Sequence, residues 1–232
     1  MTAAAVDVLA LDDLSLAALA ARRDPLAARL IITRHNQRLY RVAWSILKNQ
    51  AEAEDALQDA YLKAFTAMGR FNGQSALATW LTRIVINEAL SRRRSAERRG
   101  KQLAAEGISS MEDYRAAAQT PPAADLIAAR RELTVLLEAA IAKLPEPLRI
   151  VLILRDVDEF SAREASDALG IPEATVKTRL FRARRRLRAD LDPDVRSALC
   201  DTFRFGDRHC ETLTARVMAR LGFGEPLPST VI

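Results

Sequence analysis

A run of basic residues in the second half of the chain carries the clearest chemistry in the sequence. The segment KTRLFRARRRLR, from Lys177 to Arg188, contains seven basic residues and no acidic one. At helical spacing, one face of this segment presents Lys177, Thr178, Phe181, Arg182 and Arg185. A solvated helix face usually mixes charges of both signs, whereas this face combines cations with an aromatic ring. We therefore interpret it as a DNA-binding face rather than a solvated basic face, with polar side chains meeting base edges in the major groove and arginines contacting phosphates.

The residues around this face have the pattern of a helix-turn-helix. Ser161 and Glu164 have the spacing of a capping box at a helix start. Gly170 suits the tight turn that ends this first helix, and Pro172 suits the first turn of the next one. The second helix has its own apolar stripe, which consists of Val176, Leu180, Ala183 and Leu187. Two helices joined by a short turn that contains glycine are typical of this motif.

An acidic segment in the first third of the chain has the opposite charge. Residues 51–60, AEAEDALQDA, contain four acids and no base. The helix dipole can explain Glu52 and Glu54 in a first turn, but Asp59 lies beyond that turn. The segment therefore predicts an acidic helix face that docks a basic protein partner.

A polar turn and a basic helix follow the acidic segment. The turn is centred on Asn72 and Gly73, and Arg83 and Asn87 then share the polar face of the next helix. Such a surface suits single-stranded or opened DNA, whose bases can be unstacked into pockets. Trp80 could serve that surface or belong to the core, and we favour a ring that is mostly buried.

The composition indicates an all-α protein. The chain has 232 residues, a formal net charge of +5, 49% hydrophobic residues, only 5% aromatic residues and eight glycines. This composition disfavours a β-sandwich or barrel, and the abundant Ala, Leu and Arg favour helices. Two cysteines exclude a disulfide scaffold. We expect a cytoplasmic protein without membrane insertion, because no apolar run is long enough to span a bilayer and the N-terminus does not resemble a signal peptide.

Breaks in composition divide the chain into four parts. A first helical block with about three amphipathic helices occupies residues 1–94, and a polar segment at 95–124 is predicted to be a flexible linker. A second helical block follows at 125–191, and its first apolar stripe stops at Pro145. Residues 192–232 form an extension of unknown role.

Three segments together resemble the extracytoplasmic-function group of bacterial RNA polymerase sigma factors. They are AEAEDALQDAYLKAF, RFNGQSALATWLTRIVINEA and LPEPLRIVLILRDVDEFSAREASDALGIPEATVKTRLFRARRRLR, and the match runs from roughly Leu19 to Leu191. The resemblance implies two small helical domains joined by a flexible linker. Residues 1–94 would be sigma region 2, which binds core polymerase and melts the minus-ten element. Residues 125–191 would be sigma region 4, which binds the minus-thirty-five element with its helix-turn-helix.

The resemblance also implies a role for individual residues. The β and β′ subunits of core polymerase would be bound by Asp55, Gln58 and Asp59. The minus-ten DNA would be contacted by Phe71, Asn72, Gly73, Gln74, Ser75, Trp80, Arg83 and Asn87. The minus-thirty-five DNA would be contacted by Thr175, Lys177, Thr178, Arg179, Phe181, Arg182 and Arg185. The implied partners are core RNA polymerase, promoter DNA and an anti-sigma factor.

The extension has three interpretations. Cys200, His209 and Cys210 could form a metal or redox site, but they do not match a standard zinc spacing, so we expect no metal and no cofactor. A short helix with the stripe Leu213, Val217 and Leu221 could pack on the second domain. Alternatively, the extension could contact polymerase or a regulator.

No set of residues in the sequence forms a catalytic constellation, so we expect a binding protein and not an enzyme. The alternative function is a stand-alone helix-turn-helix regulator that binds DNA without polymerase. The acidic helix and the polar turn of the first block argue against this alternative.

Overall fold

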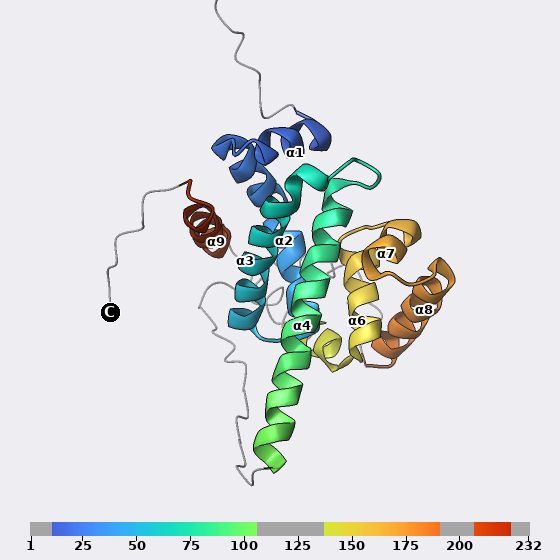
Figure 1. Cartoon of the computed structure of the whole chain (residues 1–232). Coiled ribbons are helices and arrows are strands. Elements are labelled where there is room, and N and C mark those ends of the chain that lie inside the picture. The colour runs from blue at the N-terminus through green and yellow to red at the C-terminus, as the bar shows by residue number, and fades with distance from the viewer. Residues whose placement is uncertain (1–10, 106–136, 191–206, 224–232) are drawn as a thin grey trace, which may run out of the picture.

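The computed structural model describes residues 11–105, 137–190 and 207–223, and every regular element in these ranges is helical (Figure 1). The prediction of an all-α fold is therefore confirmed. Within the same ranges, none of the helices has the length and apolar character needed to cross a membrane.

The first half of the molecule is a helical bundle. Its elements are α1 (Asp13–Ala21), α2 (Pro25–Leu47), α3 (Gln50–Ala67), the 3-10 turn η2 (Met68–Arg70) and α4 (Leu77–Ala105). Asp12, Asp24 and Asn49 cap the first three helices, and each side chain accepts a 2.9 Å hydrogen bond from a backbone N–H of the first turn. Helices α2, α3 and α4 pack against one another and bury the predicted stripe residues Leu39, Leu57 and Leu81.

The second half carries the predicted helix-turn-helix. A helical segment at 137–143 ends before Pro145, as the sequence predicts. The elements that follow are α6 (Glu146–Leu152), the π-helical turn η3 (Ile153–Val157), α7 (Ala162–Leu169) and α8 (Glu173–Asp190). Helix α8 packs on α6 and α7, so its apolar stripe faces the core of this half.

The two halves pack against each other and share a continuous hydrophobic core. Helix α7 contacts α4, and α6 contacts α2. Between them, Arg149 is buried, and its guanidinium donates to the Leu144 carbonyl at 2.6 Å and to the Ser45 carbonyl of α2. Arg41 of α2 also donates through Nε to Asp158 at 2.8 Å. Burial raises the pKa of Asp158 to about 6, although Arg41 opposes this shift.

Helix α9 (Asp207–Arg220) packs on α2 and α3, on the opposite side of the bundle from α6–α8 in the view of Figure 1. Leu213 and Val217 are buried, as the predicted stripe requires, and Leu221 is partly buried. The prediction that this helix packs on the second domain is wrong. An apolar stripe predicts that a helix face is covered, but it does not identify the surface that covers it.

One helix boundary and one helix of the first half also differ from the prediction. Helix α4 continues to Ala105, past residue 95 where the linker was expected to begin. The extra turns consist largely of Ala, Arg, Lys and Gln, which favour helix without an apolar stripe. The rest of the predicted linker, residues 106–124, lies outside the described residues. Helix α1 was not predicted, because its residues are mostly Ala and Leu without clear amphipathic spacing.

Candidate nucleic-acid and partner interfaces

The helix-turn-helix of α7 and α8 has the local geometry that its sequence predicts. The Ser161 hydroxyl accepts from the Glu164 N–H at 3.1 Å, and the Glu164 carboxylate accepts from the Ser161 N–H at 2.7 Å. Gly170 then adopts a φ of +64°, which a residue with a side chain rarely adopts. The stripe Val176, Leu180, Ala183 and Leu187 is buried. Helix α8 is therefore held with its opposite face toward solvent.

That opposite face contains most of the predicted DNA contacts. Lys177, Arg182 and Arg185 are exposed, and Phe181 exposes 67% of its surface. Thr178 is exposed too, but its hydroxyl donates to the Ala174 carbonyl at 2.8 Å.

Three other polar residues of α8 are either half-buried or already paired within the fold. Thr175 and Arg179 are half-buried. Arg184 belongs to a different side of the helix and pairs with Asp156 at 2.8 Å. The basic run is thus divided into an exposed face and at least one ion pair within the fold.

The predicted minus-ten residues lie on the loop before α4 and on the first turns of α4. Gly73 has a φ of +72°, and the side-chain Oδ1 of Asn72 accepts from the Gln74 N–H at 3.2 Å. The Phe71 and Trp80 rings contact each other with centroids 5.6 Å apart, and both rings are partly buried. Ser75 is also half-buried, whereas Asn72, Gly73, Gln74, Arg83 and Asn87 are exposed.

A pocket beside this loop contains residues that the sequence analysis missed. Its volume is about 290 Å³, and Phe71, Gly73, Ser75, Ala76 and Leu77 line one side. The other side comes from Asp12, Asp13 and Leu14 at the start of α1. Asp12 is the N-cap of α1, and its hydrogen bonds from Ser15 lower the pKa of its carboxyl. An acid at the N-cap and another in the first turn are typical of a helix start, so Asp12 and Asp13 could have indicated α1. Nothing in the sequence indicated that α1 reaches the loop.

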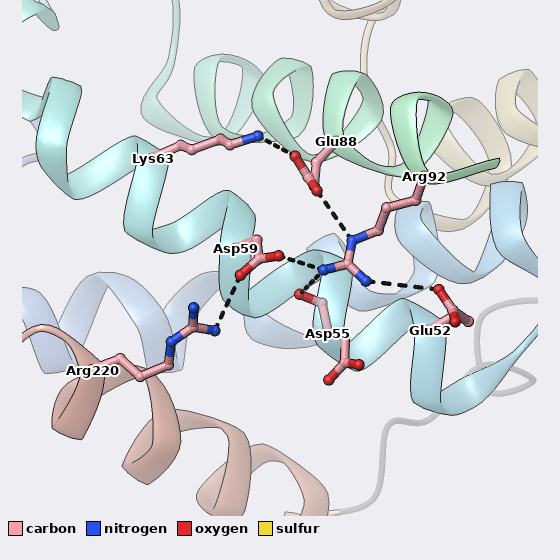
Figure 2. A network of polar contacts seen from close by, with 7 residues as sticks. All are labelled: Glu52, Asp55, Asp59, Lys63, Glu88, Arg92 and Arg220. Carbon is pink, nitrogen blue, oxygen red and sulfur yellow. Dashed lines mark hydrogen bonds and ion pairs between the residues drawn. The ribbon is translucent and has the colours of Figure 1, made fainter. Parts of the chain in front are cut away.

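The acidic face of α3 is part of a charged network with α4 at its centre (Figure 2). Arg92 of α4 lies among three carboxylates: it contacts Glu88 at 3.1 Å, Glu52 at 3.7 Å and Asp59. Burial lowers the pKa of Arg92, but its hydrogen bonds with Asp59 and Glu88 outweigh that effect and raise it. The network therefore holds the Asp59 carboxylate in a fixed position.

The three predicted polymerase contacts differ in how accessible they are. The Asp55 side chain is exposed, and only its backbone carbonyl accepts from Arg92, at 3.5 Å. Gln58 is buried, with 7% of its surface exposed. Asp59 is half-buried and also contacts Arg220 of α9 at 3.1 Å. The acidic face was predicted from the sequence, whereas its ion pairs with Arg92 and Arg220 were not.

Both halves of the chain match known protein families. Residues 31–99 match the family Sigma-70 region 2, and residues 134–187 match Sigma-70, region 4. The RNA polymerase sigma-H factor of Pseudomonas aeruginosa is 32% identical over 181 residues, which cover 76% of this chain and 92% of that protein. The ECF RNA polymerase sigma factor SigM of Mycobacterium tuberculosis is 34% identical over 157 residues, which cover 68% of this chain and 73% of SigM. The chain belongs to the extracytoplasmic-function RNA polymerase sigma factors.

Two solved structures have a similar fold. CnrH in complex with the cytosolic domain of CnrY has a TM-score of 0.55 at 27% identity, over 78% of this chain and 98% of that chain. The sigma factor RpoE of Bartonella quintana, in complex with the anti-sigma factor NepR, has a TM-score of 0.55 at 27% identity, over 71% of this chain and 94% of that chain.

Membership in this family identifies the function as that of a sigma factor, which binds core RNA polymerase and promoter DNA to start transcription. The region 2 match disfavours the alternative of a stand-alone regulator. Sigma factors are not enzymes. Among the residues that the structure describes, no group of His, Cys, Asp and Glu side chains has the geometry of a metal site. His209 and Cys210 belong to α9, while Cys200 lies outside the described residues.

Proposed function

We propose that this sigma factor divides its three tasks among three surfaces, of which the acidic face of α3 binds core polymerase. The residues that we assign to this contact are Asp55, Gln58 and Asp59. The exposed Asp55 carboxylate and the charged network around Asp59 support this assignment, because a rigid acidic surface favours docking of a basic partner.

The loop at 71–76 and the first turns of α4 form the second surface, which we assign to the minus-ten element. The assigned residues are Phe71, Asn72, Gly73, Gln74, Ser75, Trp80, Arg83 and Asn87. The pocket between this loop and α1 supports the assignment, because a flipped base needs a pocket outside the duplex. Its acidic rim would repel a phosphate but could accept hydrogen bonds from the amino group of a base.

Helix α8 forms the third surface, which we assign to the minus-thirty-five element. The assigned residues are Thr175, Lys177, Thr178, Arg179, Phe181, Arg182 and Arg185. The exposed face with Phe181 at its centre is the observation that carries this assignment, since a helix-turn-helix inserts its second helix into the major groove.

The domain boundaries follow from these assignments. We propose that region 2 occupies residues 1–94 and continues into the long helix α4, that residues up to 124 form the linker, and that region 4 occupies 125–191. We also propose an anti-sigma factor as a partner, because the structurally similar sigma factor RpoE is in complex with the anti-sigma factor NepR.

Run-off transcription with purified core polymerase and a library of promoters tests the whole proposal. We expect transcripts that begin at defined positions and that require both promoter elements. Specific binding of the free chain to duplex DNA, without any promoter-dependent transcript, would contradict it.

The assignment of the acidic face can be tested at Asp55. Asp55→Arg reverses the charge at an exposed position and leaves the ion pairs of Asp59 intact. We expect core polymerase to bind this variant at least about tenfold more weakly, because a like charge then faces a basic partner. Asp167→Arg makes the same charge change at an exposed position of α7 and should leave core binding unchanged. Equal affinity of the two variants, measured by fluorescence anisotropy without DNA, would remove Asp55 from the interface.

A further inference from the structure

Two arginines of α9 lie against the acidic face of α3. Arg220 Nη1 lies 3.1 Å from Asp59 Oδ1, and Arg216 Nη1 lies 3.9 Å from Glu54 Oε2. Figure 2 shows that Arg220 approaches Asp59 from α9 while Arg92 approaches it from α4. The Arg216 and Arg220 side chains are about half exposed, at 50% and 48%. Exposed ion pairs of this kind are weak, so these contacts can be exchanged for others.

Apolar and polar contacts complete the attachment of α9. Leu213, Val217 and Met218 are buried. Asn36 of α2 is fully buried and donates from Nδ2 to Thr214 Oγ1 at 2.8 Å and to the Cys210 carbonyl at 3.2 Å. A buried amide that loses its acceptors costs free energy unless water or another acceptor replaces them. The hydrogen bonds of Asn36 therefore favour the attached position of α9.

The C-terminal end of α9 is also anchored. Gly222 has a φ of +80°, and the Phe223 N–H donates to the Met218 carbonyl at 2.9 Å, as in a Schellman motif. Arg23, between α1 and α2, donates to the Leu221 carbonyl at 2.8 Å and stacks over the Phe223 ring at 5.7 Å. Residues 221–223 thus continue the contact with the first half of the molecule.

We propose that α9 is an internal competitor for the polymerase-docking face of α3 and must leave that face before Gln58 and Asp59 bind core polymerase. This inference rests on the proposed function, because it assumes that these two residues contact polymerase. With α9 attached, Asp59 is engaged by Arg220, and Gln58 is buried in the helix that α9 covers. The two arginines supply the positive charge that a basic partner would otherwise bring to this face.

With a competitor of this kind, the apparent dissociation constant for polymerase equals the intrinsic constant divided by the fraction of molecules in which α9 is detached. Variants that weaken the attachment should therefore bind polymerase more tightly. The test uses the full chain with Arg216→Ala and Arg220→Ala together, and Glu211→Ala as an exposed control on the same helix. Val217→Asp is the stronger variant, because it places a carboxylate at a fully buried position of α9.

The first measurement is the dissociation constant with core polymerase. We expect about two- to tenfold tighter binding for the double arginine variant, a larger gain for Val217→Asp, and no change for Glu211→Ala. The second measurement is hydrogen exchange of residues 207–223, which should become faster when wild-type chain binds core polymerase.

The outcomes separate this inference from the proposed function. If core polymerase binds and the double variant binds it more weakly or equally, or if residues 207–223 become more protected in the complex, α9 is not a competitor. If Val217→Asp does not fold, the arginine variant and the exchange measurement still decide the question. If core polymerase does not bind the wild-type chain or any variant, the proposed function fails instead.

Discussion

The Phe181 side chain lies on the exposed face of α8 and not in the core. Among the large hydrophobic side chains that the structure describes, it is the most exposed, at 67%. A ring at this position contributes little to the core, since most of its surface stays in contact with water. Its neighbours on α8 are cationic, which fits a position against the thymine methyl groups and phosphates of a major groove.

Phe181→Ala should therefore weaken DNA binding without destabilising the protein. We expect the free energy of unfolding to change by less than about 0.5 kcal/mol and the affinity of the holoenzyme for a minus-thirty-five duplex to fall by about 1 kcal/mol. The matched control is Leu26→Ala, which removes another exposed side chain, 61% accessible, at the start of α2. If the control lowers DNA affinity as much, the effect is not specific to α8.

The sequence predicted single residues well where the local helix determines their environment. The face with Lys177, Phe181 and Arg182 follows from helical periodicity alone, because the opposite stripe must be buried. The pairs of Asp59 with Arg92 and Arg220 could not be predicted in this way. They join residues that lie far apart in the sequence, and helical periodicity does not show which helices pack against each other.

At the scale of elements, the capping box at Ser161 fixes where α7 begins. Because α7 packs on both α4 and α8, its start also sets the position of the helix-turn-helix. Ser161→Ala removes the hydroxyl that accepts from the Glu164 N–H, and we expect a loss of about 1 kcal/mol in the free energy of unfolding. Ser91→Ala, at an exposed position inside α4, should leave stability unchanged or slightly higher. Equal stability of the two variants in urea titrations would show that the cap contributes nothing.

In the second half, the helix boundaries marked by stop and start residues were predicted correctly. Gly170, Pro145 and Ser161 have a backbone preference that acts locally, so they mark boundaries in sequence and in structure alike. Helix α4 lacks such a stop residue near position 95 and extends to Ala105. The predicted stripe of α9 was correct, but the expected packing partner was wrong: α9 packs on α2 and α3, and an apolar stripe does not identify the helices that cover it.

At the scale of the whole molecule, buried polar contacts hold the two halves together. Arg149 is 2% exposed, and its guanidinium donates to the carbonyls of Ser45, Ala142 and Leu144. Burial lowers its pKa to about 10, and the nearby Arg93 adds to this shift. It therefore remains protonated at neutral pH and keeps all three carbonyls paired.

Arg149→Ala should leave these carbonyls without a donor in the interior. We expect a loss of about 3 kcal/mol in the free energy of unfolding, because a buried group that loses a charged hydrogen-bond partner is costly. Arg163→Ala removes an exposed arginine of α7 and should change stability by less than about 0.5 kcal/mol. A similar midpoint of chemical denaturation for both variants would mean that Arg149 does not join the halves.

The contacts of Arg149 with Ser45 and of Arg41 with Asp158 span 104 and 117 positions of the sequence. They close the intervening chain into a large loop. The entropy of closing a flexible loop grows only with the logarithm of its length, and doubling the length costs about 0.6 kcal/mol. In the proposed linker, insertions or deletions of a few residues between 106 and 124 should therefore change the free energy of unfolding by well under about 0.6 kcal/mol.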